Sequence, residues 1–247
     1  LFRSRNKMKI GIIRAGPIGQ SIAKKLVNRG HEVKVADARG IERLAGKTIV
    51  GTAVSPEEVG QNIEVLIISV PLHAIPTIQP ILEHVGDEVI IVDTSNYYPF
   101  RDQQIEAIDQ GMVESVWVTE QLGRPVIKAF SNLLAFTLEN KGTPAGTTGR
   151  IAMAVAGDHA AHKKNIMNIV DDCGFDSVDA GSIAESWNMQ PGTPAYCTEL
   201  TKEELTLALQ KADKQNAPQL RDDIMAQFSM AFTHDDIVAL NRKVFGA

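Results

Sequence analysis

The sequence predicts an α/β protein whose core is a doubly wound parallel sheet. A short apolar run at 8–13 leads into a glycine turn, and apolar residues then recur at helical spacing over 20–29. The alternation of an apolar run with a helical stretch continues to about residue 130. Runs such as 65–70 are apolar throughout, as in strands that are covered on both faces of a parallel sheet.

Six strands are expected, and helical stretches separate them. Gly30 closes the first helix as a C-cap, and the next apolar run completes a strand-helix-strand unit. Ser55 is placed to cap the helical turn that begins at Pro56. The expected strands are 8–13, 31–37, 48–53, 64–70, 88–93 and 126–130, and the expected helical stretches are 20–29, 56–61, 74–84, 101–110 and 114–121.

Composition narrows the class of partner. The 247 residues carry a formal net charge of -5 and are 44% apolar, which allows one large core and argues against nucleic-acid binding. The longest apolar runs are far shorter than the roughly 20 residues that cross a bilayer. We therefore expect a cytoplasmic protein with a small-molecule partner, neither a nucleic acid nor a membrane. We also expect the native chain to begin at Met8, with residues 1–7 non-native or disordered.

The turn after the first strand is close to the dinucleotide-binding pattern GxGxxG, with Arg14 in place of the first glycine. Gly16 and Gly19 supply the glycines that let a pyrophosphate approach the backbone and let the helix pack on the strand. Pro17 fits a first helical turn. The pattern predicts cofactor contacts along the whole turn, at Arg14, Ala15, Gly16, Pro17, Ile18 and Gly19. The alternative is a strand-to-helix turn without a ligand.

The loop at 140–150, rich in glycine and proline, separates two predicted domains. The first, 8–140, is a dinucleotide-binding Rossmann domain. The second, 150–247, begins with a strand at 151–156, a helix at 158–173 on an acidic N-cap and a strand at 175–179. It is helical from residue 199 on, with a capping box at Thr201.

Two residues at the end of the second strand point to different nicotinamide cofactors. Asp37 lies about 20 residues beyond Gly16, where an acid bonds the ribose 2′-hydroxyl of NAD. Arg39 is placed to face the 2′-phosphate of NADP. A third interpretation is that Asp37 and Arg39 pair with each other, and a fourth is that Arg39 is a solvated charge of the loop.

The chain resembles the NADP-dependent oxidoreductases that pass hydride between NADP and the deazaflavin coenzyme F-420. The resemblance covers about residues 8 to 181. It rests on the segments 9–13, 15–19, 36–40, 68–71, 126–130, 155–158 and 178–181, of which Lys-Ala-Phe at 128–130 and Ala-Gly-Asp at 156–158 are more specific than the glycine turn.

The resemblance implies where the cofactor lies. Ala38 and Arg39 would hold the adenosine 2′-phosphate, which favours NADP (NADPH) over NAD. Ser69, Val70, Pro71 and His73 would lie under the nicotinamide ribose, and the backbone of Ala129 and Phe130 would lie near the carboxamide. The family usually has Asn after this Phe, whereas this chain has Ser131 and then Asn132.

The implied activity is an oxidoreductase that moves hydride between the nicotinamide and a planar acceptor such as a deazaflavin or flavin, in a homodimer. The family has no obligate acid or base, because hydride transfer depends mainly on positioning, so no catalytic residue is assigned. A rival function is an NADP(H)-binding redox sensor without turnover. Arg14 has three possible roles: a pyrophosphate ligand, an obstruction of the adenosine cleft or a solvent-exposed side chain.

Other candidate residues have a structural explanation beside the functional one. Asn96 and Tyr97 either line the acceptor pocket or form a capped turn. The segment 186–197, with Trp187 and Tyr196, is either a pocket wall or dimer contact, or simple packing. His159 and His162 have no third ligand at an interpretable spacing, so no metal site is predicted. Cys173 and Cys197 are expected to be reduced thiols.

Overall fold

A parallel sheet forms the centre of the molecule in the computed structural model, which describes residues 7–14 and 16–247. Its strand order is β3-β2-β1-β4-β5-β6. The first three strands are added towards one edge of the sheet and the next three towards the other edge, so the strand order reverses between β1 and β4. This is the doubly wound topology that the sequence predicts. The strands are β1 (Lys9–Arg14), β2 (Glu32–Ala36), β3 (Thr52–Ala53), β4 (Val65–Ser69), β5 (Ile90–Asp93) and β6 (Val126–Lys128).

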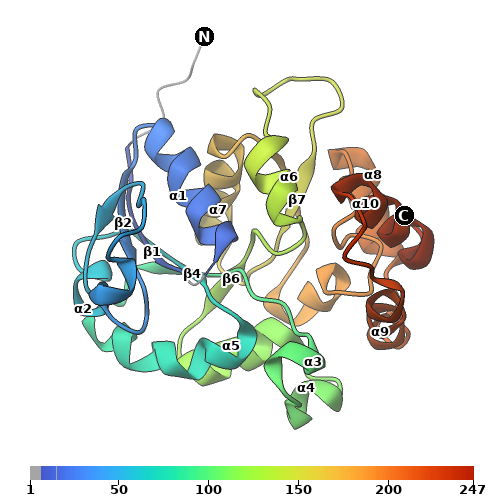
Figure 1. The fold of residues 1–247 in the computed structure, drawn as a ribbon, viewed down its shortest axis with the longest axis horizontal. Coiled ribbons are helices and arrows are strands. Elements are labelled where there is room, and N and C mark those ends of the chain that lie inside the picture. The colour runs from blue at the N-terminus through green and yellow to red at the C-terminus, as the bar shows by residue number, and fades with distance from the viewer. Residues whose placement is uncertain (1–6, 15) are drawn as a thin grey trace.

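Helices cover both faces of this sheet (Figure 1). The helices α1 (Pro17–Asn28), α6 (Ala135–Asn140) and α7 (Ala160–Asp172) lie on one face. On the other face lie α2 (Pro56–Val59), the 3₁₀ segment η2 (Leu72–His84) and α5 (Glu114–Leu122). The two short helices α3 (Pro99–Asp102) and α4 (Glu106–Asp109) follow β5.

Side-chain alternation along β1 divides the core into two clusters. Ile10 and Ile12 pack with α1 and α7, whereas Ile13 packs on the opposite face with η2 and α5. All residues of β4 are buried, as expected for a strand at the middle of a parallel sheet. Arg14 follows the same alternation, so its side chain leaves the strand on the α1 face.

A second, two-stranded parallel sheet pairs β7 (Ala152–Val155) with β8 (Asp176–Asp179). The backbones of Ala156 and Lys128 exchange two hydrogen bonds, at 2.9 and 3.0 Å. These bonds join the end of the two-stranded sheet to the end of β6. After η3 (Ile183–Met189) come α8 (Lys202–Lys211), α9 (Ala217–Gln227) and α10 (His234–Phe245), which Figure 1 shows grouped on one side of the molecule. The capping box at Thr201 is confirmed.

Two predicted helices differ from the structure because of their local chemistry. The stretch 74–84 is a 3₁₀ segment rather than an α-helix, since Pro76 and Pro80 lack the N–H that an α-helix requires. The stretch 101–110 divides into α3 and α4, because Gln103 takes a positive φ of 63° between them.

Three smaller expectations are also corrected. The third strand is shorter than 48–53, and α6 occupies a stretch for which no element was predicted. The N-cap of α7 is His159, whose side chain accepts from His162 N at 3.3 Å, rather than the acidic Asp158. Residues 1–6 and the predicted cofactor contact at Ala15 lie outside the described residues. Among the described helices, none has the length and apolar character needed to cross a membrane.

Gly19 sets how closely α1 approaches the sheet, which makes it a test of the fold. A Cβ built on Gly19 would lie 2.8 Å from Cβ of Arg14 and 3.2 Å from Cβ of Ser69. We expect Gly19→Ala to lower the free energy of unfolding by about 1–2 kcal/mol, since the steric cost exceeds the gain in helix propensity. Urea denaturation measures this difference. Gly16→Ala is the control, because a Cβ there meets no atom within 4 Å; equal stabilities of the two variants would contradict the prediction.

Candidate cofactor and acceptor site

The first turn of α1 leaves room for a ligand. Gly16 is the N-cap residue, with an extended backbone (φ -155°, ψ -164°) and no side-chain cap. Neither this conformation nor any neighbouring atom requires a glycine, since a built Cβ meets nothing within 4 Å. The space in front of Gly16 and the uncapped N–H groups of α1 therefore suit the close approach of an anion such as a pyrophosphate.

Arg14 is buried rather than exposed to solvent, with 7% of its surface accessible. In the amide orientation that completes the hydrogen bonding, the side-chain oxygen of Gln20 accepts from Nη1 of Arg14 at 3.0 Å and also from Nη2. Arg14 lines a cavity of about 120 Å³ together with Lys24, Thr48 and Glu139. Burial lowers the pKa of Arg14, while nearby Asp37 acts in the opposite direction. The solvent-exposed alternative for Arg14 is therefore wrong.

Asp37 and Arg39 form the ion pair that was one interpretation of their spacing. Oδ1 of Asp37 accepts from the backbone N and from Nε of Arg39, both at 3.0 Å, and Oδ2 accepts from Nη2 at 3.1 Å. Burial raises the pKa of Asp37, but the bonds from Arg39 and the positive charge of Arg43 outweigh it and hold this pKa below its usual value. The buried Asp37 carboxylate thus interacts electrostatically with three guanidinium groups, those of Arg14, Arg39 and Arg43. The three arginines Arg14, Arg39 and Arg43 outnumber the two acids Asp37 and Glu42 of this region, which leaves one positive charge in excess.

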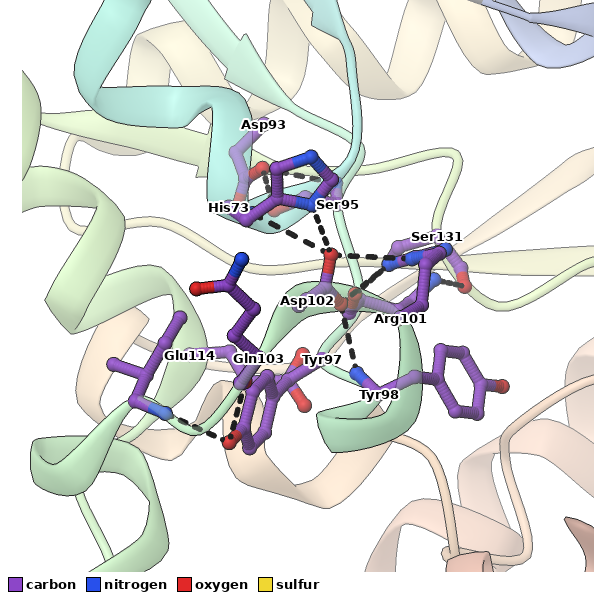
Figure 2. A network of polar contacts seen from close by, with 12 residues as sticks. His73, Asp93, Ser95, Tyr97, Tyr98, Arg101, Asp102, Gln103, Glu114 and Ser131 are labelled. Atoms are coloured by element: carbon purple, nitrogen blue, oxygen red, sulfur yellow. Dashed lines mark hydrogen bonds and ion pairs between the residues drawn. The ribbon is translucent and has the colours of Figure 1, made fainter.

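A second carboxylate lies at the ends of β4 and β5, where Figure 2 shows His73 held over Asp102. Nδ1 of His73 lies 2.9 Å from Oδ1 of Asp102. Arg101 donates to both carboxylate oxygens, from Nε at 3.1 Å and from Nη2 at 2.7 Å, and the backbone N of Tyr98 donates to Oδ2 at 2.9 Å. The carboxylate is fully buried, whereas the His73 side chain is 47% exposed. The network therefore fixes an accessible imidazole at this edge of the sheet.

A third group of charges lies deeper, below the same edge. Asp93 accepts from the hydroxyls of Ser95 and Ser115 at 2.6 and 2.7 Å. Lys128 is completely buried and donates to the backbone oxygen of Ser95 at 3.1 Å. Its Nζ lies 3.6 Å from Oε2 of Glu114, which accepts no hydrogen bond. The cost of burying the Glu114 carboxyl is thus only partly offset by its interaction with Lys128.

The carboxamide contacts were predicted at the backbone of Ala129 and Phe130, which directly follow β6. Ala129 and Phe130 are buried, and Phe130 has a positive φ of 57°, a strained conformation for a bulky residue. Asn96 Nδ2 donates to the backbone oxygen of Ser131 at 2.9 Å, while Asn96 Oδ1 and Ser131 Oγ are buried without a partner. Asn132 is structural, because it accepts from Ala154 N and donates to the backbone oxygen of Ala195.

Some of the other candidate residues belong to the core. Tyr97 is completely buried and its hydroxyl donates to Asp109 at 2.9 Å, so it does not line a pocket. In the segment 186–197, Tyr196 is buried and its hydroxyl lies 2.6 Å from that of Tyr98. Cys173 and Cys197 are buried free thiols. His159 and His162 stack on each other, and the described residues contain no group of three side chains fit to hold a metal.

Three charged residues of this region were missed by sequence reasoning. The burial of Lys128 was predictable, because a lysine inside the apolar run 126–130 must be buried with a partner. Asp102 and Glu114 had no such signal, since both lie in stretches with the composition of surface helices. Three further predicted contacts lie at the carboxyl end of β4: Ser69 and Val70 are buried, and Pro71 is partly exposed.

The sheet topology, the open glycine turn and the charges at the strand ends define a nicotinamide-dinucleotide-binding protein of the Rossmann class. Residues 9–97 match the model of a family described as NADP oxidoreductase, coenzyme F420-dependent. Protein YjhV of Escherichia coli (strain K12) is 39% identical over 110 residues, which are 43% of this chain and 80% of that protein. The chain belongs to this family of NADP-dependent oxidoreductases.

Solved structures agree with this fold. A hypothetical protein, SMa0349 of Sinorhizobium meliloti, superposes with a TM-score of 0.67 at 27% identity over 80% of this chain and 96% of that chain. A "putative f420 dependent nadp-reductase" of Arthrobacter sp. FB24 superposes with a TM-score of 0.56 at 21% identity over 71% of this chain and 86% of that chain.

Glu114 predicts a pH dependence of stability. Burial raises its pKa from 4.5 to about 7, although Lys128 acts in the opposite direction. Because folding raises the pKa of this acid, its contribution to stability is full below pH 4.5 and is lost as the pH rises through about 7. We expect the wild-type protein to lose roughly 2 kcal/mol of unfolding free energy over this range relative to Glu114→Gln.

Urea denaturation at several pH values measures the two slopes. Glu120→Gln, at an exposed position of the same helix, is the control and keeps the wild-type slope. A Glu114→Gln variant with the wild-type slope would show that this carboxyl does not titrate in the range.

Proposed function

We propose that the protein is an NADPH-dependent reductase that transfers hydride to a small planar acceptor such as a deazaflavin or flavin. The observation that carries the choice of NADPH is the charge at the end of β2. Asp37 is already engaged by three N–H groups of Arg39, and Arg14 and Arg43 add further positive charge. A 2′-phosphate suits this surplus of guanidinium groups better than a neutral 2′-hydroxyl does.

In this mechanism the residues of the chain bind the cofactor and the acceptor and orient them. When bound, the cofactor supplies a hydride from C4 of its reduced nicotinamide ring. The first turn of α1 holds the pyrophosphate, and the end of β2 holds the adenosine phosphate. The ends of β4, β5 and β6 receive the nicotinamide half, because ligands of doubly wound sheets lie across the point where the strand order reverses. Most of the acceleration comes from positioning the two rings against each other.

Arg39 gives the test of cofactor choice. We expect Arg39→Ala to weaken NADPH binding about ten-fold or more, since it removes a phosphate ligand and leaves the buried Asp37 carboxylate without its partner. NADH binding should change less than about two-fold, because no phosphate meets the lost charge. Fluorescence titration with both cofactors measures this, with Lys243→Ala on the exposed face of α10 as the control. An equal loss for NADPH and NADH would contradict the role of Arg39.

Gly16 tests the place of the pyrophosphate. A Cβ at this position meets no protein atom, so Gly16→Ala should unfold within about 0.5 kcal/mol of the wild-type protein. The same methyl group would occupy the space of the pyrophosphate, and we expect the dissociation constant of NADPH to rise about ten-fold or more. Unchanged NADPH affinity in a folded Gly16→Ala protein would place the phosphates elsewhere.

Turnover tests the activity itself. The protein is mixed with NADPH and, in separate assays, with a deazaflavin, a flavin and a ferric complex, and nicotinamide oxidation is followed by absorbance. We expect oxidation with a planar ring acceptor. Saturable NADPH binding without turnover on any acceptor would instead support the redox sensor.

A further inference from the structure

The His73–Asp102 pair has a fixed proton arrangement. Asp102 is completely buried, and its pKa is lowered because hydrogen bonds from Arg101, Tyr98 N and His73 outweigh the effect of burial, so the carboxylate is ionised. An ionised carboxylate only accepts hydrogen bonds. Nδ1 of His73, at 2.9 Å from Oδ1, must therefore carry a proton in both charge states of the ring. The proton that His73 exchanges is the one on Nε2.

The pair reaches from the core to the accessible edge of the sheet. The His73 side chain is 47% exposed while the Asp102 side chain is 0% exposed. His73 follows β4, which adjoins the reversal of strand order, and Asp102 follows β5, the next strand of the sheet. Figure 2 shows the ring lying above the Asp102 carboxylate. An exposed imidazole with a buried orienting carboxylate is the arrangement of a general acid or base.

The charged groups near the ring are already engaged in hydrogen bonds. Asp102 is the carboxylate in direct contact, and Arg101 meets that carboxylate with two nitrogen atoms rather than meeting the ring. Asp93, another buried carboxylate of this edge, is bonded to Ser95 and Ser115. No hydrogen bond of the described residues requires the positive charge of His73, because a neutral ring with its proton on Nδ1 makes the same bond to Asp102. The ring is therefore free to release a proton and remain in place.

We propose that His73, oriented by Asp102, donates a proton to the acceptor that receives the hydride. This inference rests on the proposed reductase function. The C4–H bond of NADPH breaks and its electron pair forms a C–H bond on the acceptor, whose displaced π electrons collect on a conjugated nitrogen or oxygen. The Nε2–H bond of the imidazolium breaks and its proton forms the new N–H or O–H bond. NADPH is oxidised, the acceptor is reduced, and the neutral imidazole regains a proton from water.

The proposal narrows the class of acceptor. A ring with a carbon that takes hydride and a conjugated nitrogen or oxygen that takes a proton, as in a deazaflavin, uses both parts of the site. A ferric complex takes electrons and has no such atom to protonate. The preferred acceptor is therefore a conjugated ring system rather than a metal complex.

His73→Asn tests the proton transfer. The amide nitrogen of Asn can donate to Asp102 but cannot supply a proton from an imidazolium. With a deazaflavin as acceptor and NADPH at saturation, we expect the turnover number to fall about 10² to 10⁴-fold. Fluorescence titration separates this loss from any change in NADPH affinity. The fall of the wild-type rate with rising pH, and its solvent deuterium isotope effect, should both disappear. His84→Asn, at an exposed position at the end of η2, is the matched control and keeps the wild-type rate and pH profile.

Asp102→Asn separates orientation from packing. Loss of the anion disfavours the imidazolium, so the decline of the rate should begin at a lower pH than in the wild-type protein, provided that circular dichroism shows a folded chain. A purely structural role for the pair would lower stability without moving the pH profile. If His73→Asn keeps the wild-type turnover, pH profile and solvent isotope effect while the wild-type protein reduces a deazaflavin, this inference is wrong and the proposed function stands. If the wild-type protein binds NADPH but reduces no acceptor, both are wrong.

Discussion

The parallel direction of the strands is the constraint on which the site depends. Every strand of the six-stranded sheet ends at the same edge, so the polar residues that follow the strands must share that edge. Charges brought together in this way need partners, because an uncompensated buried charge is costly. Asp37 is paired with Arg39, Asp102 with Arg101 and His73, and Lys128 with Glu114. His73 and Asp102 come from different segments, as do Lys128 and Glu114, and these two pairs fix the loops relative to one another.

The three ion pairs differ in exposure, and this separates their roles. The Arg39 side chain is 59% exposed, so its guanidinium is accessible to an incoming phosphate. Lys128 and Glu114 are buried on all sides, so they act on stability rather than on binding. His73 and Asp102 lie between these extremes, with one accessible member and one buried member. The proposed binding pair, a structural pair and the proposed proton-transferring pair thus lie along one edge of the sheet.

The nucleotide-binding half was predictable because its signals are local. Apolar runs bounded by glycines gave six strands, and the spacing of Gly16, Gly19 and Asp37 gave the likeness to a cofactor turn. The segment 72–84 has apolar residues at helical spacing, but it is a 3₁₀ segment because of Pro76 and Pro80. Predicting this would have required giving the two prolines more weight than the spacing. The pairing of His73 with Asp102 was not predictable, because the two residues are 29 positions apart and only the docking of α3 beside η2 brings them together. Arg14 likewise needed the packing of α1 to show that it is buried.

The contact between the hydroxyls of Tyr98 and Tyr196, at 2.6 Å, joins the loop after β5 to the segment before α8. Burial raises the pKa of both phenols well above the usual value, so neither ionises near neutral pH. Tyr98 also donates its backbone N–H to Asp102, and the carboxyl-terminal part of the chain is thereby connected to the orienting carboxylate. Both phenols behind Asp102 thus keep their protons near neutral pH. The connection from the carboxyl-terminal part of the chain to the orienting carboxylate therefore adds no charge of its own to the site.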